Sequence, residues 1–235
     1  MLSRTEFRDK LYAVLEENTS VAHPLVAELV QPRANWELLR ALTLQGYQLT
    51  KNFLAYIEHL YFYCPLPKHK KALLVNLYEE ETGRLSGTKN HVRLMEDFVR
   101  AIGISDDERD AAVPYPETRE LIDYRMDLVM DPSRYHLGVA AVAVASEGQN
   151  LEDTAGQNRH SLLGKVYGLT EQDTLFFSVH AKEDVGHVRE GIALVVDLCT
   201  DSRMQGEALD VVEHTCRLFQ GMYDGVAKRH LRTVA

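Results

Sequence analysis

Two histidines and an aspartate share one side of a helical segment near the C-terminus. His180, Asp184 and His187 stand at positions i, i+4 and i+7 of the segment FFSVHAKEDVGHVREGIALV. At about 100° per residue their side chains project from one stripe of a helix. Two imidazoles and a carboxylate suit a borderline divalent metal such as Fe(II), Mn(II) or Zn(II). A surface cluster or a hydrogen-bonded buried network is the alternative interpretation.

A further candidate ligand follows a stretch of small apolar residues. Glu147 comes directly after GVAAVAVAS, residues 138–146. A carboxylate in such surroundings is costly to bury unless it is paired or binds a cation. Glu147 is therefore a candidate metal ligand, and the polar end of a helix is the alternative.

Glu81 and His91 form a third candidate group in the segment NLYEEETGRLSGTKNH. A separation of ten residues places them about 80° apart on a straight helix. Gly83 and Gly87 permit an unwound turn that would bring both side chains to one centre. The alternative is that the acidic run 79–81 is a solvated surface.

Three separate segments thus supply carboxylates and histidines. Helical bundles build metal sites in this way, with inward carboxylates and histidines from facing helices. Six ligands are enough for two metals with open positions, whereas a single zinc needs only three or four.

The composition excludes several other classes of protein. A net charge of −9 over 235 residues argues against a nucleic-acid binder and against adhesion to anionic membranes. The three cysteines include no CxxC pair, so neither a disulfide framework nor a thiolate zinc site is expected. No window resembles a signal peptide or a membrane span. A cytoplasmic location is the expectation.

Helical periodicity dominates the chain, and no alternating strand pattern occurs. We expect an all-α fold with about seven main helices, in which residues 1–235 form a single helical domain. Two helical domains divided near the polar connection 103–116 are the alternative. Main and shorter helices together are expected over 5–17, 34–62, 68–82, 89–102, 117–130, 133–150, 158–168, 171–199 and 203–230, with a short segment that opens at His23-Pro24.

The candidate ligands and their surroundings resemble the haem-oxygenase-like dimetal oxidases, within the superfamily of TenA, PqqC and CADD-like proteins. The resemblance covers most of the chain. It includes the aromatic segment LQGYQLTKNFLAYI, the E-x-G and N-H motifs around residues 81–91, Glu147, and the H-x3-D-x2-H motif at residues 180–187. A seven-helix bundle like haem oxygenase is the fold that it implies.

The resemblance implies a dioxygen-dependent non-haem diiron oxidase or oxygenase. The implied reaction is N-oxygenation, desaturation or oxidative cleavage of a small amino acid or amino-acid derivative. The irons are Fe(II) before dioxygen reacts, and a mixed Mn–Fe pair is compatible with similar ligands. Glu80 is the alternative to Glu81, which the E-x-G pattern favours. One metal would take this glutamate, His91, and His187 or its neighbour, and the division of the ligands between the two metals stays open. The six implied metal ligands are Glu81, His91, Glu147, His180, Asp184 and His187.

Several branches of the superfamily fit less well. A p-aminobenzoate synthase branch consumes its own side chains and carries tyrosine and lysine where this chain has Ser146 and Gln157. TenA-type hydrolysis needs an activated cysteine, and none is indicated. Oxidative decarboxylation of a fatty acid is the alternative activity. The alternative outside the oxidases is a metal-free binding protein related to CADD or PqqC.

A carboxylate substrate would need a cation in the pocket. Lys51 and Arg159 are candidates for this cation, and Tyr47 is a candidate lining residue, although long cations are more often solvated at the surface. The expected partners are a small-molecule substrate and dioxygen, with no nucleic acid and no membrane. The resemblance also implies a homodimer.

Overall fold

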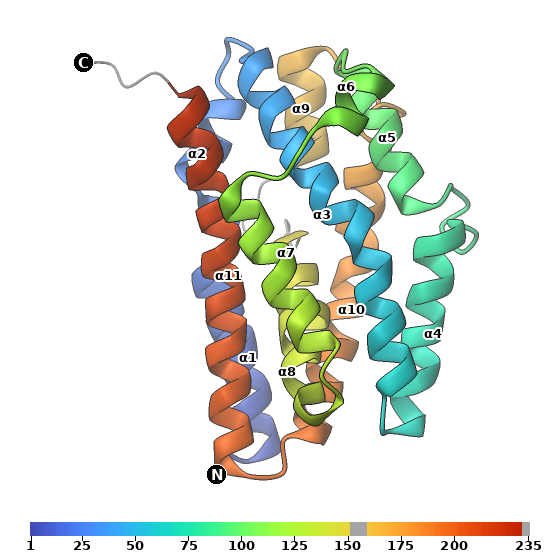
Figure 1. The fold of residues 1–235 in the computed structure, drawn as a ribbon, viewed down its shortest axis with the longest axis vertical. Helices are drawn as coiled ribbons and strands as arrows, with labels where there is room; N and C mark the ends of the chain where they lie inside the picture. The colour runs from blue at the N-terminus through green and yellow to red at the C-terminus, as the bar shows by residue number, and fades with distance from the viewer. Residues whose placement is uncertain (151–158, 232–235) are drawn as a thin grey trace.

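The computed structural model describes residues 1–150 and 159–231, and this part of the chain is helical without a strand. Figure 1 shows long helices that run alongside one another as a bundle. The all-α expectation is confirmed. The α-helices are α1 (Arg4–Asn18), α2 (Pro24–Leu29), α3 (Trp36–Tyr63), α4 (Pro67–Thr82), α5 (His91–Ala101), α6 (Asp106–Ala111), α7 (Pro116–Val129), α8 (Tyr135–Val139), α9 (Arg159–Tyr167), α10 (Leu175–Leu198) and α11 (Ser202–His230).

The expected long helices are present, and the higher helix count comes from short ones. Helix α6 lies inside the segment 103–116 that we expected to be an irregular connection. Its N-cap is Ser105, whose side chain accepts a hydrogen bond from the backbone N–H of Glu108. The acidic first turn also complements the positive end of the helix dipole. The cap and the acidic turn therefore favour this six-residue helix, which has no apolar face.

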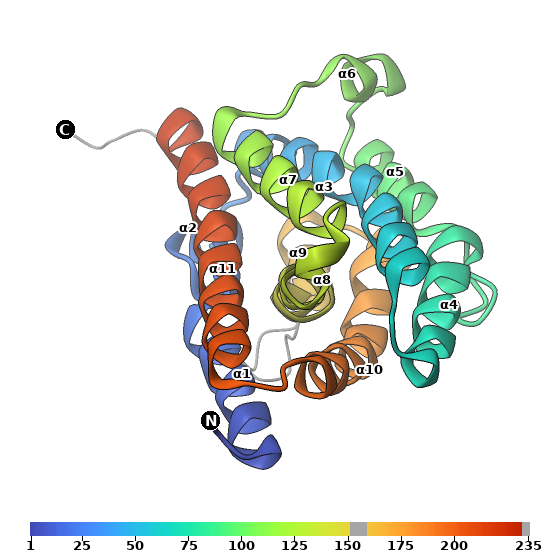
Figure 2. The ribbon, with the colours of Figure 1, turned by 60° about the horizontal axis from the view of Figure 1, so that its bottom comes forward.

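The segment after α7 occupies the centre of the bundle. Figure 2 shows α8 surrounded by α3, α7, α10 and α11. Residues Val139–Ala145, which begin at the end of α8, are all at most 5% exposed. Small side chains are required here because helices approach this segment from several sides. The expected single helix over residues 133–150 is instead α8, a π-helix over Ala140–Ser146 and a 3-10 turn over Glu147–Asn150.

One glycine allows α10 to lie directly against the π-helix. A Cβ atom at Gly191 would stand 2.3 Å from the carbonyl oxygen of Ala143. Gly191 lies about one turn beyond His187, and Glu147 lies about one turn beyond Ala143. The close approach therefore brings Glu147 next to the histidine-bearing stripe of α10.

A second glycine ends α4 and turns the chain back towards it. Gly83 caps the helix with φ of 61°, and its N–H donates to the carbonyl oxygen of Glu79 at 2.7 Å. The carboxylate of Glu79 then accepts hydrogen bonds from the backbone N–H groups of Leu85 (2.6 Å) and Ser86 (3.2 Å). This loop returns the chain to α5, whose first residue is His91. The glycine break predicted before His91 is confirmed.

None of the helices in the described ranges is long and apolar enough to cross a membrane.

The contact at Gly191 can be tested by adding one methyl group. Gly191→Ala should lower the free energy of unfolding by about 1–3 kcal/mol, because the methyl group overlaps the Ala143 carbonyl. Gly186→Ala is the matched control on α10, since nothing lies within 4 Å of its added Cβ. The control should raise stability by about 0.5–1 kcal/mol through helix propensity. Urea unfolding measures both, and equal stability of the two variants would contradict the packing described.

Candidate metal centre

Three side chains from three helices meet in a first group. Glu80 lies near the end of α4, His91 begins α5 and His180 lies on α10. One potential ligand atom from each lies within 4.8 Å of the others. The Nδ1 atom of His91 is 3.1 Å from Oε1 of Glu80, and the ring centroids of His91 and His180 are 4.7 Å apart. All three side chains are buried.

A second group combines the 3-10 turn that follows the π-helix with the next turns of α10. Nδ1 of His187 lies 3.6 Å from Oε1 of Glu147 and 3.7 Å from Oδ1 of Asp184. Glu147 and Asp184 are 2% and 1% exposed, so both carboxylates are removed from water. The two groups adjoin because His180, Asp184 and His187 project from one stripe of α10, as the sequence spacing predicts.

The buried nitrogen and oxygen atoms of these two groups are chemically suited to bind metal ions. Both ring nitrogens of His91, Nδ1 of His187 and Oε1 of Glu80 are buried and have no hydrogen bond of good geometry among the described residues. Buried polar atoms without such partners are costly, and bound cations remove that cost. Imidazole nitrogens mixed with carboxylate oxygens suit iron, manganese or zinc.

Hydrogen bonds outside the two groups orient their members. Nδ1 of His180 lies 2.7 Å from the carbonyl oxygen of Phe176, one turn earlier on α10. Nδ1 therefore carries the proton and donates, which leaves Nε2 as the free lone pair for a metal. Burial lowers the pKa of His180 and keeps its ring neutral. Nδ2 of Asn76 donates to Oε1 of Glu147 at 3.0 Å and fixes that carboxylate from the side of α4.

The other two histidines are held as cations in the absence of a metal. Burial opposes the charge on His91, but the adjacent Glu80 carboxylate outweighs it and raises the pKa to about 9. Burial likewise opposes the charge on His187, where Glu147 and Asp184 raise the pKa to about 11. The same pairing holds the pKa of Glu147 below its usual value despite its burial.

A third set of atoms shares His91 with the first group. Glu79, His91 and Glu183 also bring potential ligand atoms within 4.8 Å of one another. The Glu79 carboxylate, however, already accepts three hydrogen bonds from Leu85 and Ser86. Glu183 is only half-buried, and burial raises its pKa. We interpret Glu79 as the residue that shapes the loop leading to His91.

The structure does not bring Glu81 into either group. Neighbouring residues on a helix point about 100° apart, so only one face of the acidic run can face α10. Glu81 is exposed, and its Oε2 accepts a hydrogen bond from Asn90 at 3.2 Å. Glu80, the alternative that the E-x-G pattern disfavoured, is buried in its place. The division of the ligands, which the sequence left open, places His91 beside His180 in the structure.

Two of the candidate substrate residues lie away from the centre. Lys51 is exposed, with Nζ 5.8 Å from the ring centroid of Tyr47. Tyr47 is buried and donates to Oε1 of Glu96 at 3.4 Å. Both lie on a face of α3 turned away from the cavity, which is lined instead by Thr50 and Phe53. The third candidate, Arg159, begins α9, and its side chain lies outside the described residues.

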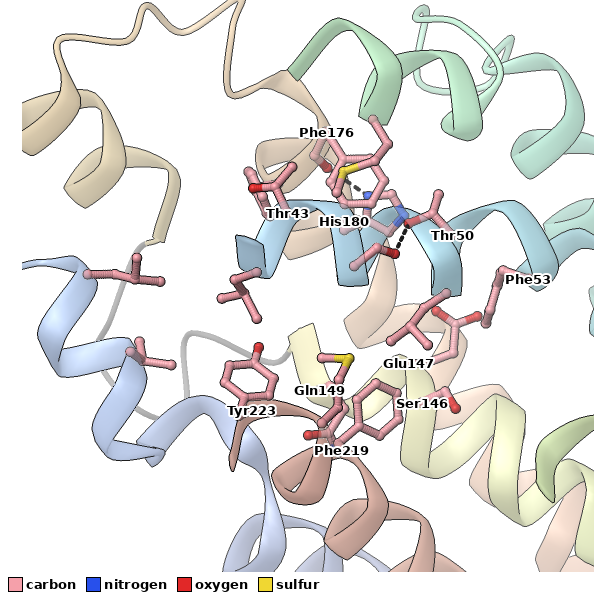
Figure 3. A pocket seen from close by; sticks show the side chains of 18 of the residues that line it. Thr43, Thr50, Phe53, Ser146, Glu147, Gln149, Phe176, His180, Phe219 and Tyr223 are labelled. Carbon is pink, nitrogen blue, oxygen red and sulfur yellow. Dashed lines mark hydrogen bonds between the residues drawn. The ribbon is translucent and has the colours of Figure 1, made fainter. Parts of the chain in front are cut away.

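A cavity of about 190 Å³ adjoins the two groups. Glu80, Glu147 and His180 form part of its wall, and most of the remaining lining is apolar. In the view of Figure 3, His180 and Phe176 face Phe219 and Tyr223 across this space. A substrate in the cavity would therefore lie beside the candidate metal ligands.

Comparisons with known proteins agree with this fold. The chain is similar to the 4-aminobenzoate synthase of Chlamydia muridarum, with 26% identity over 92% of this chain and 87% of that protein. It superposes on a domain with a haem-oxygenase-like fold from Shewanella denitrificans with a TM-score of 0.74 and 19% identity, covering 97% and 94% of the two chains. It also superposes on a TenA homologue from Pseudomonas syringae with a TM-score of 0.75 and 14% identity, covering 94% of this chain and 92% of that chain.

The fold and the buried donors define a helical protein of the haem-oxygenase-like class. Residues 40–220 match the family described as iron-containing redox enzymes, and the chain belongs to that family. The predicted resemblance is confirmed at this level. The sequence did not reveal the roles of Asn76 and Glu79, although Asn76 lies one turn before Glu80 and so shares its face of α4.

Neighbouring glutamates offer a matched test of the first group. Glu80→Gln should lower Fe(II) affinity by at least about 10–100-fold, the usual cost of losing a partner of a ligand, because it removes a negatively charged ligand itself. Glu81→Gln removes the same charge one residue away on the exposed face and should bind iron as the wild type does. Anaerobic titration with Fe(II) measures both affinities. A loss confined to Glu81→Gln would restore the E-x-G assignment and contradict the structure.

Metal binding should release protons. At pH 7.5 His91 and His187 lie below their metal-free pKa values of about 9 and about 11 and carry protons that a metal must displace. His180 has a lowered pKa and contributes none. Loading both groups should therefore release about two protons per chain, and affinity should rise with pH. An indicator dye in weak buffer measures the release, and uptake without acidification would contradict these assignments.

Proposed function

We propose that this chain is a dioxygen-dependent oxidoreductase that uses two irons. Glu80, His91 and His180 would hold one iron. Glu147, Asp184 and His187 would hold the other. The observation that supports this proposal is the pair of adjoining buried groups along one stripe of α10. Two-metal sites place their ions about 3.5–4 Å apart, which adjoining groups on consecutive helical turns allow.

Two Fe(II) ions bound in these groups would supply the electrons that activate dioxygen. The protein's own contribution is the arrangement around them. Phe176 fixes the tautomer of His180, and Asn76 orients Glu147. The apolar cavity limits water beside the ligands, which protects reactive species from side reactions. Each group has three protein ligands, so open positions remain for dioxygen and substrate.

We propose a small amino acid or amino-acid derivative as substrate, on the basis of the family resemblance. The apolar lining of the cavity favours a second candidate, the oxidative decarboxylation of a fatty acid. In each case the substrate would be a carboxylic acid whose body lies against the apolar wall.

The relatives' name, 4-aminobenzoate synthase, suggests a third chemistry that this chain supports less well. In the branch that consumes its own side chains, a tyrosine directly precedes the second glutamate. Here Ser146 stands in that place and donates to the carbonyl oxygen of Ala141 at 2.8 Å. The corresponding lysine position is Gln157, which lies outside the described residues. We therefore do not propose self-sacrificing synthesis. A single domain, a homodimer and a cytoplasmic location remain predictions.

Anaerobic loading with Fe(II) followed by dioxygen tests the proposed function. The wild-type protein should take up two irons per chain, consume dioxygen and show a transient visible absorption band. His180→Ala should lose the band and most of the dioxygen consumption, because it removes a ligand of one iron. His214→Ala is the control, since His214 is exposed on α11.

Other results would contradict the proposal in different ways. One tightly bound metal without a dioxygen reaction would indicate a structural or hydrolytic site. No iron uptake would favour the metal-free binding protein.

A further inference from the structure

The wall of the cavity contains a buried cation. Arg125 on α7 is 1% exposed and lines the cavity together with Ser146 and Glu147. Its Nε donates to the carbonyl oxygen of Leu121 at 3.1 Å, and its Nη1 donates to Oγ of Ser146 at 3.2 Å. Its Nη2 is buried without a hydrogen bond among the described residues.

No carboxylate in the described part of the chain lies within ion-pair distance of this guanidinium. Glu147, which lines the same cavity, is instead paired with His187 and Asn76. Burial lowers the pKa of Arg125, yet a guanidinium keeps its charge inside proteins. A buried charge of this kind is costly unless an anion joins it.

Two aromatic rings hold the guanidinium in place. Its central carbon lies 4.8 Å from the ring centroid of Tyr56 and 5.3 Å from that of Phe219. These contacts offset part of the cost of burial but leave Nη2 without a hydrogen-bond partner among the described residues. A guanidinium with an unpaired Nη group can donate a charge-assisted hydrogen bond to a carboxylate oxygen.

The rest of the cavity indicates the size and polarity of the group attached to such a carboxylate. Its wall is built largely from aliphatic and aromatic side chains of α2, α3, α9, α10 and α11. In other proteins a cavity of roughly 150 Å³ holds a benzene molecule. The 190 Å³ observed here is therefore sufficient for such a body. The apolar lining includes Leu29, Leu39, Leu42, Met95, Leu163 and Met222.

We propose that Arg125 binds the carboxylate of the substrate, and that the substrate is a monocarboxylate with a benzene-sized apolar body. That the bound carboxylate is a substrate rests on the proposed function, but binding of the carboxylate at Arg125 does not need iron. Arg125 contacts Ser146, the residue before Glu147, so an anion held there lies at the metal-facing wall of the cavity. Its apolar body would extend past His180 towards the leucines of α3.

Binding of benzoate to the metal-free protein tests the proposal, with benzamide as the neutral analogue of the same shape. Calorimetry should show that wild-type protein binds benzoate on the order of 100-fold more tightly than benzamide, because only benzoate pairs with the guanidinium. Arg125→Met should lose this preference, and Arg125→Lys should keep part of it. Arg119→Met is the matched control on exposed α7 surface and should behave as wild type.

The melting temperature separates a binding role from a structural one. Without ligand, Arg125→Met should melt at the same or a higher temperature than the wild type, because it removes an unpaired buried charge. A lower melting temperature together with unchanged benzoate binding would overturn the proposal. Equal affinity of the wild type for benzoate and benzamide, including no binding of either, would also overturn it.

Iron loading and dioxygen consumption of the same preparations keep the two proposals apart. A protein that binds no iron but still prefers benzoate through Arg125 would contradict the proposed function and leave the carboxylate site standing. A protein that binds two irons and consumes dioxygen, yet shows no Arg125-dependent preference for benzoate, would support the proposed function and contradict the carboxylate site.

Discussion

The burial of mixed charge inside a helical bundle is the constraint on which the rest of this structure depends. Three carboxylates and three histidines lie in two adjoining groups, and most of their ligand atoms are shielded from water. Without a metal, protons on His91 and His187 balance part of the negative charge. Bound cations would balance it more completely. The helix interruption at Gly83 and the tight packing at Gly191 bring these groups together.

The sequence was sufficient for the fold class and for most residues of the candidate site, because both depend on helical periodicity. The stripe of His180, Asp184 and His187 follows from spacing alone. The choice between Glu80 and Glu81 does not, because it depends on how α4 is rotated against α10, which is a matter of packing. The π-helix before Glu147 was also beyond the sequence, since its small apolar residues fit an ordinary helix equally well.

The cavity is lined both by candidate metal ligands and by Arg125, the proposed carboxylate-binding residue. Lys51 and Tyr47 were reasonable candidates by residue type, but the rotation of α3 turns them away from the cavity. Arg125 was missed because a single arginine in an amphipathic helix usually faces solvent. Only the structure shows that its guanidinium is buried between Tyr56 and Phe219 beside Ser146.

The most direct measurement of the central claim is anomalous X-ray diffraction from crystals loaded anaerobically with Fe(II). The two-iron account predicts two iron peaks, one among Glu80, His91 and His180 and the other beside Glu147. A single peak, or a peak between Glu79 and Glu183 instead of the first, would contradict it.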